Sequence, residues 1–261
     1  MPVDSSLVDG VAVITLDRQE SLNSFDDELG TEFLELIEAA SADVAVRCIV
    51  ITGAGRAFSA GEDLSALQST YERGEAPPLG DTLVRRYNPT IQAITSAPKP
   101  VIAAVNGVAA GAGASIALAC DHRVASEKAR LVLAFIEAGL VADSGAIWFL
   151  ARMIGTARAL HYATTAESID AETGRSLGLF DEVVAVEGFE RAWRDAASRL
   201  AAGPTAAYAI AKELVYSALD RSLAEQLEIE VDAQTRAGRT ADHLEGVRAF
   251  LEKRRPEFRG R

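Results

Sequence analysis

Residues 98–121 read PKPVIAAVNGVAAGAGASIALACD, and this stretch decides the fold. The apolar run at residues 101–105 predicts a strand that is buried on both faces. The small residues at 107–113 predict a turn, and residues 114–120 predict the helix that follows. A strand, a glycine-rich turn and a helix in this order are typical of an α/β fold with a largely parallel sheet.

A second junction of the same kind lies earlier in the chain. Residues 47–52 predict another buried strand, which leads into TGAGRAFSAGEDL at residues 52–64. Small residues let a ligand approach the backbone, and the N–H groups at a helix start are unpaired. Two such junctions side by side would aim two N–H groups at one oxygen as an oxyanion hole. Either junction alone is also explained by a tight turn, and neither contains a dinucleotide fingerprint or a P-loop.

The rest of the chain continues the alternation of strands and helices. Residues 7–16 predict a hairpin around Asp9-Gly10, and residues 26–40 predict an amphipathic helix. Residues 68–80 predict a loop, and residues 83–95 predict a helix. We expect short strands at 122–125 and 130–133, and a mostly helical chain beyond Gly145 that ends in amphipathic helices at 206–218, 223–237 and 241–253.

Composition limits the class of protein. The 261 residues carry a formal net charge of −12, which opposes binding to nucleic acid or to an anionic membrane. The sequence has no apolar run of membrane-spanning length, and its first ten residues lack the features of a signal peptide, so we expect a cytoplasmic protein. Cys48 and Cys120 lack the spacing of metal ligands and are expected to be buried free thiols.

Three motifs, in order along the chain, resemble the signatures of the crotonase (enoyl-CoA hydratase/isomerase) superfamily. They are FSAGEDL at 58–64, the stretch at 98–121, and AGLVADSGAIWFLARMIG at 138–155. The likeness extends from Leu22-Asn23-Ser24 to EGVRAFLEKRRPEF at 245–258, so it covers nearly the whole chain. The run AGEDL and the triplet Tyr87-Asn88-Pro89 are most similar to the phenylacetate-pathway epoxyacyl-CoA isomerases of that superfamily.

The resemblance implies a fold, a ligand and an assembly. The fold is α/β, with a crotonase-like ββα-spiral core that binds acyl-CoA at residues 1–190 and a C-terminal helical trimerisation region at 191–261. The resemblance implies an acyl-CoA thioester substrate, a homo-oligomer (trimer or hexamer), and no metal or cofactor apart from the CoA of the substrate. The backbone N–H groups of Glu62 and Ala112 would bind the thioester oxygen. Substrate and CoA contacts would come from Leu22, Ser24, Ala60, Gly61, Asp63, Leu64, Val108 and Gly111, and, toward a neighbouring subunit's ligand, from Phe250 and Lys253.

The catalytic acids depart from the pattern of the superfamily's hydratases. Those hydratases carry two glutamates, and the matching positions here are Ser115 and Phe135. Adding water to an enoyl thioester needs one group to activate the water and another to deliver the proton, so these replacements argue against hydration.

One acid remains at a position that the resemblance marks as catalytic. Asp143 lies where the superfamily's isomerases place a catalytic aspartate. We expect its apolar neighbours to raise its pKa and make it a better base; they are Leu140, Val141, Ala142, Ile147 and Trp148. Without the resemblance, Asp143 is explained as the N-cap of the helix that follows.

The sequence therefore predicts an isomerase that shifts a double bond, or rearranges an acyl-CoA, by proton transfer through Asp143. Three alternatives stay open: an enoyl-CoA hydratase (a lyase), a catalytically weak acyl-CoA-binding relative, and a serine hydrolase. The last is suggested by GASIA at 113–117, with Asp143 and His243 following in chain order. The side chain of Glu62 has no assigned role. Residues 68–80, Tyr87 and Trp148 are expected to shape the acyl pocket, but the sequence does not identify the acyl group.

Overall fold

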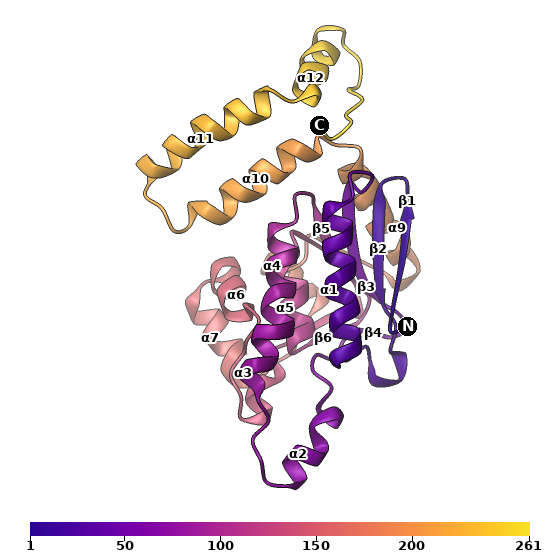
Figure 1. Ribbon diagram of the computed structural model, residues 1–261, viewed down its shortest axis with the longest axis vertical. Helices are drawn as coiled ribbons and strands as arrows, with labels where there is room; N and C mark the ends of the chain where they lie inside the picture. The colour runs from indigo at the N-terminus through magenta and orange to yellow at the C-terminus, as the bar shows by residue number, and fades with distance from the viewer.

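The computed structural model describes residues 1–261, apart from the side chain of Ala66. Its strands form two sheets, of six and four strands (Figure 1). The first sheet has the order β1 (Val3–Val8), β2 (Val11–Leu16), β3 (Cys48–Gly53), β5 (Val101–Val105), β7 (His122–Ser126) and β10 (Glu182–Val184). The second has the order β4 (Ala57–Ser59), β6 (Val108–Ala110), β8 (Arg130–Val132) and β9 (Ile169–Asp170).

The chain builds both sheets at once, in a spiral. Each turn adds a strand to the first sheet and then one to the second, as β3 and β4, β5 and β6, and β7 and β8 do. Neighbouring strands from successive turns are parallel in both sheets. Only the β1–β2 hairpin and the β8–β9 pair are antiparallel among the described pairings. The predicted ββα spiral is confirmed.

The alternation of side chains along β3 divides the core in two. Ile49 and Ile51 face helix α1 (Asp27–Ala42) and belong to the main cluster, whereas Val50 faces helix α9 (Val186–Ala201) on the other side of the sheet. Asp26 caps α1 by accepting a hydrogen bond from the Leu29 N–H at 2.8 Å. This packing fixes the carboxyl ends of β3 and β5, from which the two glycine-rich junctions emerge.

Several predicted elements differ from the structure. Residues 68–80 contain helix α2 (Gln68–Glu72) and the start of α3 (Leu79–Thr82), so this segment is not only a loop. The predicted turn at 107–113 contains strand β6, and helix α5 (Ala112–Ala119) begins two residues earlier than expected. The predicted helix at 83–95 begins as the π-helical turn η3 (Leu83–Tyr87) and continues as α4 (Asn88–Ser96).

Helices account for most of the rest of the chain. The last three, α10 (Thr205–Ala218), α11 (Leu223–Gly238) and α12 (Ala241–Leu251), extend away from the sheets (Figure 1). Helix α9 crosses the expected division at residue 190 and packs on the first sheet, and the division stays a prediction.

Both cysteines are free and buried, as predicted. No described helix is both long and apolar enough to cross a membrane. The remaining elements are η1 (Gln19–Ser21), η2 (Leu64–Leu67), η4 (Ala134–Ala138), α6 (Ala146–Ile154), α7 (Thr156–Thr165) and α8 (Ala171–Ser176).

Candidate active site

The two glycine-rich junctions meet at Gly61 and Ala112. Strands β4 and β6 are parallel neighbours, so the residues that follow them lie side by side. A Cβ atom placed on Gly61 would lie 3.1 Å from the backbone nitrogen of Ala112 and 2.8 Å from the Ala110 carbonyl oxygen. Gly61 also has a φ of +88°, which side chains rarely tolerate. Glycine at position 61 therefore permits the close approach of the junctions.

The orientation of the Gly61–Glu62 peptide follows from its hydrogen bond to Phe25. The Phe25 N–H donates to the Gly61 carbonyl at 2.7 Å, and the Asp63 N–H donates to the Phe25 carbonyl at 2.9 Å. In a trans peptide the N–H points opposite to the C=O, so the Glu62 N–H points away from Phe25. The N–H of Ala112, the first residue of α5, has no partner within its helix. The backbone hydrogen bonds of the described residues engage neither N–H, so both are available to an oxyanion.

Asn23 supports this geometry, and sequence analysis did not single it out. The side chain is fully buried, and its amide donates to the carbonyls of Ala57 at 2.8 Å and Ala54 at 2.9 Å. The backbone carbonyl of Asn23 accepts a hydrogen bond from the hydroxyl of Ser59 at 2.8 Å. These bonds tie the 22–24 segment to strand β4. The available signal was the residue type, because asparagine is one of the few residues that readily adopt a left-handed conformation, and Asn23 has a φ of 58°.

Asp143 is a half-buried carboxyl group close to α5. Burial raises its pKa above the ordinary aspartate value, and a 2.7 Å hydrogen bond from the Ser144 hydroxyl opposes that rise. The predicted direction is therefore confirmed. Three of the five apolar neighbours expected to raise its pKa are themselves exposed: Val141 is 79% exposed, Ile147 is 43% exposed and Trp148 is 36% exposed.

The capping explanation for Asp143 is wrong. Helix α6 begins at Ala146 after Gly145, and the Asp143 carboxylate accepts from its neighbour Ser144. It is the backbone carbonyl of Asp143 that accepts from the Ala146 N–H, at 2.9 Å. The carboxylate is therefore free of a helix-capping role.

The two positions that carry glutamates in the superfamily's hydratases hold no acid here. Ser115 is fully buried, and its hydroxyl donates to the carbonyl oxygens of Gly111 at 3.3 Å and Asp143 at 3.1 Å. Phe135 is half-buried, with its ring edge 4.0 Å from a Cβ placed on Gly111. Ser115 thus holds the Asp143 backbone against α5. The serine hydrolase alternative fails, because the hydroxyl is buried and engaged and His243 lies on α12, well apart from α5 (Figure 1).

The other predicted binding residues fall into two groups. Leu22, Ser24, Ala60, Asp63, Leu64, Val108 and Gly111 belong to the junctions or the segment paired with them. Asp63 is held by Arg18 at 3.0 Å, and its pKa is lowered, mainly by the hydrogen bond from the Ser65 side chain. By contrast, Phe250 and Lys253 are exposed and lie at the α12 end of the molecule, so one chain does not bring them to Asp143 (Figure 1). Their predicted role toward a neighbouring subunit stays a prediction.

Tyr87 joins the site from the turn η3. It is 4% exposed, and its pKa is raised by burial, by the Glu62 carboxylate, which accepts a hydrogen bond from its hydroxyl, and further by Asp143. Both carboxylates therefore act on the same phenol. The sequence indicated Tyr87 as a wall of the pocket, but not its bond to Glu62.

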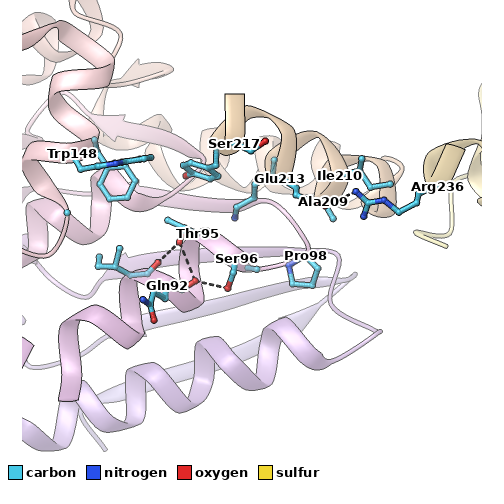
Figure 2. A pocket seen from close by; sticks show the side chains of 16 residues that line it. Gln92, Thr95, Ser96, Pro98, Trp148, Ala209, Ile210, Glu213, Ser217 and Arg236 are labelled. Atoms are coloured by element: carbon cyan, nitrogen blue, oxygen red, sulfur yellow. Dashed lines mark hydrogen bonds and ion pairs between the residues drawn. The ribbon is translucent and has the colours of Figure 1, made fainter. Parts of the chain in front are cut away.

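Trp148 lies in a separate groove of about 1040 Å³ between α4, α6 and α10. Figure 2 shows this groove, with Gln92, Thr95 and Ser96 on one side and Ile210 and Glu213 on the other. The Arg152 guanidinium stacks 3.8 Å over the Trp148 ring. The groove lining includes Gly145 but not Asp143 or either glycine-rich junction. Among the described residues, no cluster of three or more His, Cys, Asp or Glu side chains is arranged to hold a metal ion.

The chain resembles known proteins along nearly its whole length. The model of the enoyl-CoA hydratase/isomerase family matches residues 7–261. The 1,2-epoxyphenylacetyl-CoA isomerase of Escherichia coli strain K12 is 42% identical over 97% of this chain and 96% of that protein. A Rhodobacter capsulatus protein named "probable enoyl-CoA hydratase" is 44% identical over 97% of this chain and 96% of that protein. A crystal structure of an enoyl-CoA hydratase from Polaromonas sp. JS666 has a TM-score of 0.92 and 36% identity, covering 98% of this chain and 99% of that one.

The chain therefore belongs to the enoyl-CoA hydratase/isomerase family and is an acyl-CoA enzyme of the crotonase superfamily. Its relatives include both isomerases and hydratases, and they share the fold.

Proposed function

We propose that this enzyme is an isomerase that moves a double bond of an acyl-CoA thioester, with Asp143 carrying the proton. The observation that carries the proposal is the pairing of one half-buried carboxyl of raised pKa with two acid-free positions, Ser115 and Phe135. A single carboxylate is sufficient for isomerisation, because the same group takes and returns the proton.

The reaction is a proton transfer through an enolate. The thioester oxygen of a 3-enoyl-CoA accepts hydrogen bonds from the N–H groups of Glu62 and Ala112. The Asp143 carboxylate removes a proton from C2, and the electron pair moves onto the thioester oxygen as an enolate. Asp143 then returns the proton at C4, which leaves the conjugated 2-enoyl-CoA. No electrons enter or leave, so the step needs no redox cofactor.

In this mechanism both the oxyanion hole and the base contribute to the rate. Each oxyanion-hole donor contributes roughly 10²–10³-fold to kcat by stabilising charge in the transition state. A positioned general base contributes roughly 10²–10⁴-fold, and its efficiency is highest when its pKa approaches the working pH. The raised pKa of Asp143 is in the direction that favours a base.

The test uses a 3-enoyl-CoA and a trans-2-enoyl-CoA in parallel. We expect the 3-enoyl substrate to gain the absorbance of a conjugated thioester without a change in mass, and Asp143→Asn to slow this by roughly 10²–10⁴-fold. If the 2-enoyl substrate instead gains one water at a comparable rate, the protein is a hydratase and the proposal is wrong.

A third outcome separates an enzyme from a binder. If neither substrate reacts but both bind, the next substrate is a ring-epoxide thioester, since the Escherichia coli relative is named for 1,2-epoxyphenylacetyl-CoA. If Asp143 is needed for rearrangement of that epoxide, the enzyme is still an isomerase, but its acyl group is a ring epoxide and not a 3-enoyl chain. Binding without turnover of any of the three would identify a catalytically weak acyl-CoA-binding relative.

A further inference from the structure

The side chain of Glu62 ends in a partly buried group of polar contacts. The Nη2 atom of Arg86 lies 2.7 and 2.8 Å from the two carboxylate oxygens of Glu62. The hydroxyl of Tyr87 donates a short hydrogen bond of 2.5 Å to one of those oxygens. Arg86 and Tyr87 are consecutive residues of the π-helical turn η3, 24 and 25 positions away in the sequence. One carboxylate therefore joins the loop after β4 to the turn before α4.

Arg86 has few alternatives to this partner. Its side chain is 9% exposed, and a Cβ at Gly30 would lie 2.1 Å from the Arg86 Cδ, so helix α1 leaves room for it only because residue 30 is glycine. The other carboxylate in range is Asp27, 3.6 Å from Nη1 and fully exposed to solvent. Nε and Nη1 of Arg86 make no hydrogen bond to a described residue. Because a buried charge without a partner is costly, Arg86 strongly favours the arrangement in which Glu62 faces it.

The Glu62 main chain is held on its other side by Phe25. The Phe25 N–H holds the carbonyl of the Gly61–Glu62 peptide, and the Phe25 carbonyl holds the next N–H, that of Asp63. Phe25 also packs on the Tyr87 ring, with centroids 6.0 Å apart. Because Gly61 has no side chain, the bond that joins its Cα to this peptide would otherwise rotate with little resistance. The peptide that carries the Glu62 N–H is therefore fixed in two ways, through the Gly61 carbonyl and through the side chain of Glu62.

We propose that Arg86 and Tyr87 are positioning residues, which act through the Glu62 carboxylate to hold the Glu62 N–H on the thioester oxygen. The inference rests on the proposed function, in which that N–H is an oxyanion donor. Donors of this kind work because they are already oriented when charge develops, so a small loss of alignment lowers the rate. The Glu62 side chain thus has a role that needs no proton transfer.

Tyr87→Phe is the decisive variant, because it removes one hydrogen bond and keeps the ring and the Glu62–Arg86 pair. We expect kcat to fall roughly 10–100-fold while KM changes less than about threefold, since misaligned catalytic groups lose rate rather than binding. Glu62→Gln is the second variant and should act in the same direction. The matched controls are Tyr208→Phe and Glu190→Gln, which lie on α10 and α9 and should retain wild-type kcat.

A spectroscopic measurement isolates the oxyanion contact from the chemistry. Butanoyl-CoA labelled with ¹³C at the thioester carbonyl has no double bond to move, and its carbonyl stretch falls in frequency when the oxygen accepts hydrogen bonds. We expect difference infrared spectra to show a clear downshift in the wild type, a smaller one in Tyr87→Phe and Glu62→Gln, and an unchanged one in both controls. Thermal unfolding of each variant identifies any that fails to fold.

The outcomes separate this inference from the proposed function. A Tyr87→Phe protein that folds and keeps the wild-type carbonyl shift and kcat overturns the positioning role. A wild type that shows the downshift but isomerises no substrate overturns the proposed reaction and leaves the positioning role intact. A variant whose KM rises while kcat and the carbonyl shift stay constant assigns Tyr87 to substrate binding instead.

Discussion

At the scale of single residues, the burial that favours Asp143 as a base also makes its ionised form destabilise the fold. Burial raises the pKa of its carboxyl group, so the folded protein binds this proton more tightly than the unfolded chain does. Asp143 therefore favours folding most below its unfolded pKa of about 3.9, and that contribution is lost as the pH rises through the higher folded pKa. At neutral pH the ionised group opposes folding.

This sign predicts that Asp143→Asn is the more stable protein near pH 7. The amide carries no charge to desolvate, and it can still accept the hydrogen bond from Ser144. Each kcal/mol gained moves the unfolding midpoint upward by roughly 2–4 °C for a domain of this size. Thermal unfolding at pH 7 and below pH 4 tests it, because the two proteins should converge in acid. An inactive variant that is also less stable at pH 7 would show that the carboxylate stabilises the fold.

The same shift predicts the acid limb of the rate profile. Only the carboxylate form of Asp143 can remove a proton, so kcat should fall as the pH drops through the raised pKa in the enzyme–substrate complex. The midpoint of that limb should lie above the ordinary aspartate value of about 3.9. A profile of kcat against pH on the 3-enoyl substrate measures it. A flat profile down to pH 4 would assign the base to another group.

At the scale of elements, the junction between β4 and β6 depends on Gly61. A methyl group there would contact the Ala110 carbonyl and the Ala112 nitrogen, and the φ of +88° would add strain of roughly 1–2 kcal/mol. We expect Gly61→Ala to lower the unfolding temperature and to reduce kcat by roughly 10²-fold, because the two donors would move apart. Gly188→Ala in α9 is the matched control, since a methyl there meets no atom within 4 Å. Wild-type activity in Gly61→Ala would mean that the junction can adjust.

Elements that are decided locally could be predicted from the sequence, and those decided by distant partners could not. Strand β5 was predicted residue for residue, because Pro100 and Asn106 bound an apolar run that suits a strand buried on both faces. Strands β4 and β6 are three residues long and rich in alanine, so their pattern is that of a turn. They become strands by pairing in the second sheet, where β4 pairs with β6 and β6 pairs with β8.

The candidate site divides in the same way. The roles of Glu62, Ala112 and Asp143 were predicted from three motifs, each of which is one continuous stretch of sequence. The bond from Tyr87 to Glu62 and the clamp from Asn23 to Ala57 join residues 25 and 34 positions apart, and no local spacing encodes them. The N-cap hypothesis for Asp143 failed because two residues in left-handed conformations, Ser144 and Gly145, delay the start of α6. A serine does not predict a left-handed conformation, which is uncommon for residues other than glycine, asparagine and aspartate.

At the scale of the whole molecule, the C-terminal helices expose apolar side chains that one chain leaves uncovered. Leu223 is 74% exposed, Val231 is 70% exposed and Phe250 is 82% exposed. Apolar side chains exposed to this extent often mark interaction sites in soluble proteins. We predict that α10–α12 mediate self-association, so that light scattering gives three or six times the chain mass of 27.6 kDa. Leu223→Glu with Val231→Glu should lower that mass toward one chain, whereas Val44→Glu, at an exposed position in the α1–β3 connection, should not.

Assembly and catalysis should then be linked through the residues that follow α12. If Phe250 and Lys253 contact the ligand of a neighbouring subunit, dissociation removes a cation from the CoA phosphates and should raise KM by roughly tenfold, the equivalent of about 1.4 kcal/mol. Lys253→Ala should raise KM similarly while the oligomer keeps its mass, because that side chain is exposed and forms no ion pair with a described residue of its own chain. Steady-state kinetics and light scattering on both variants measure the two effects separately. A dissociated variant with wild-type KM would show that each subunit binds CoA with its own residues alone.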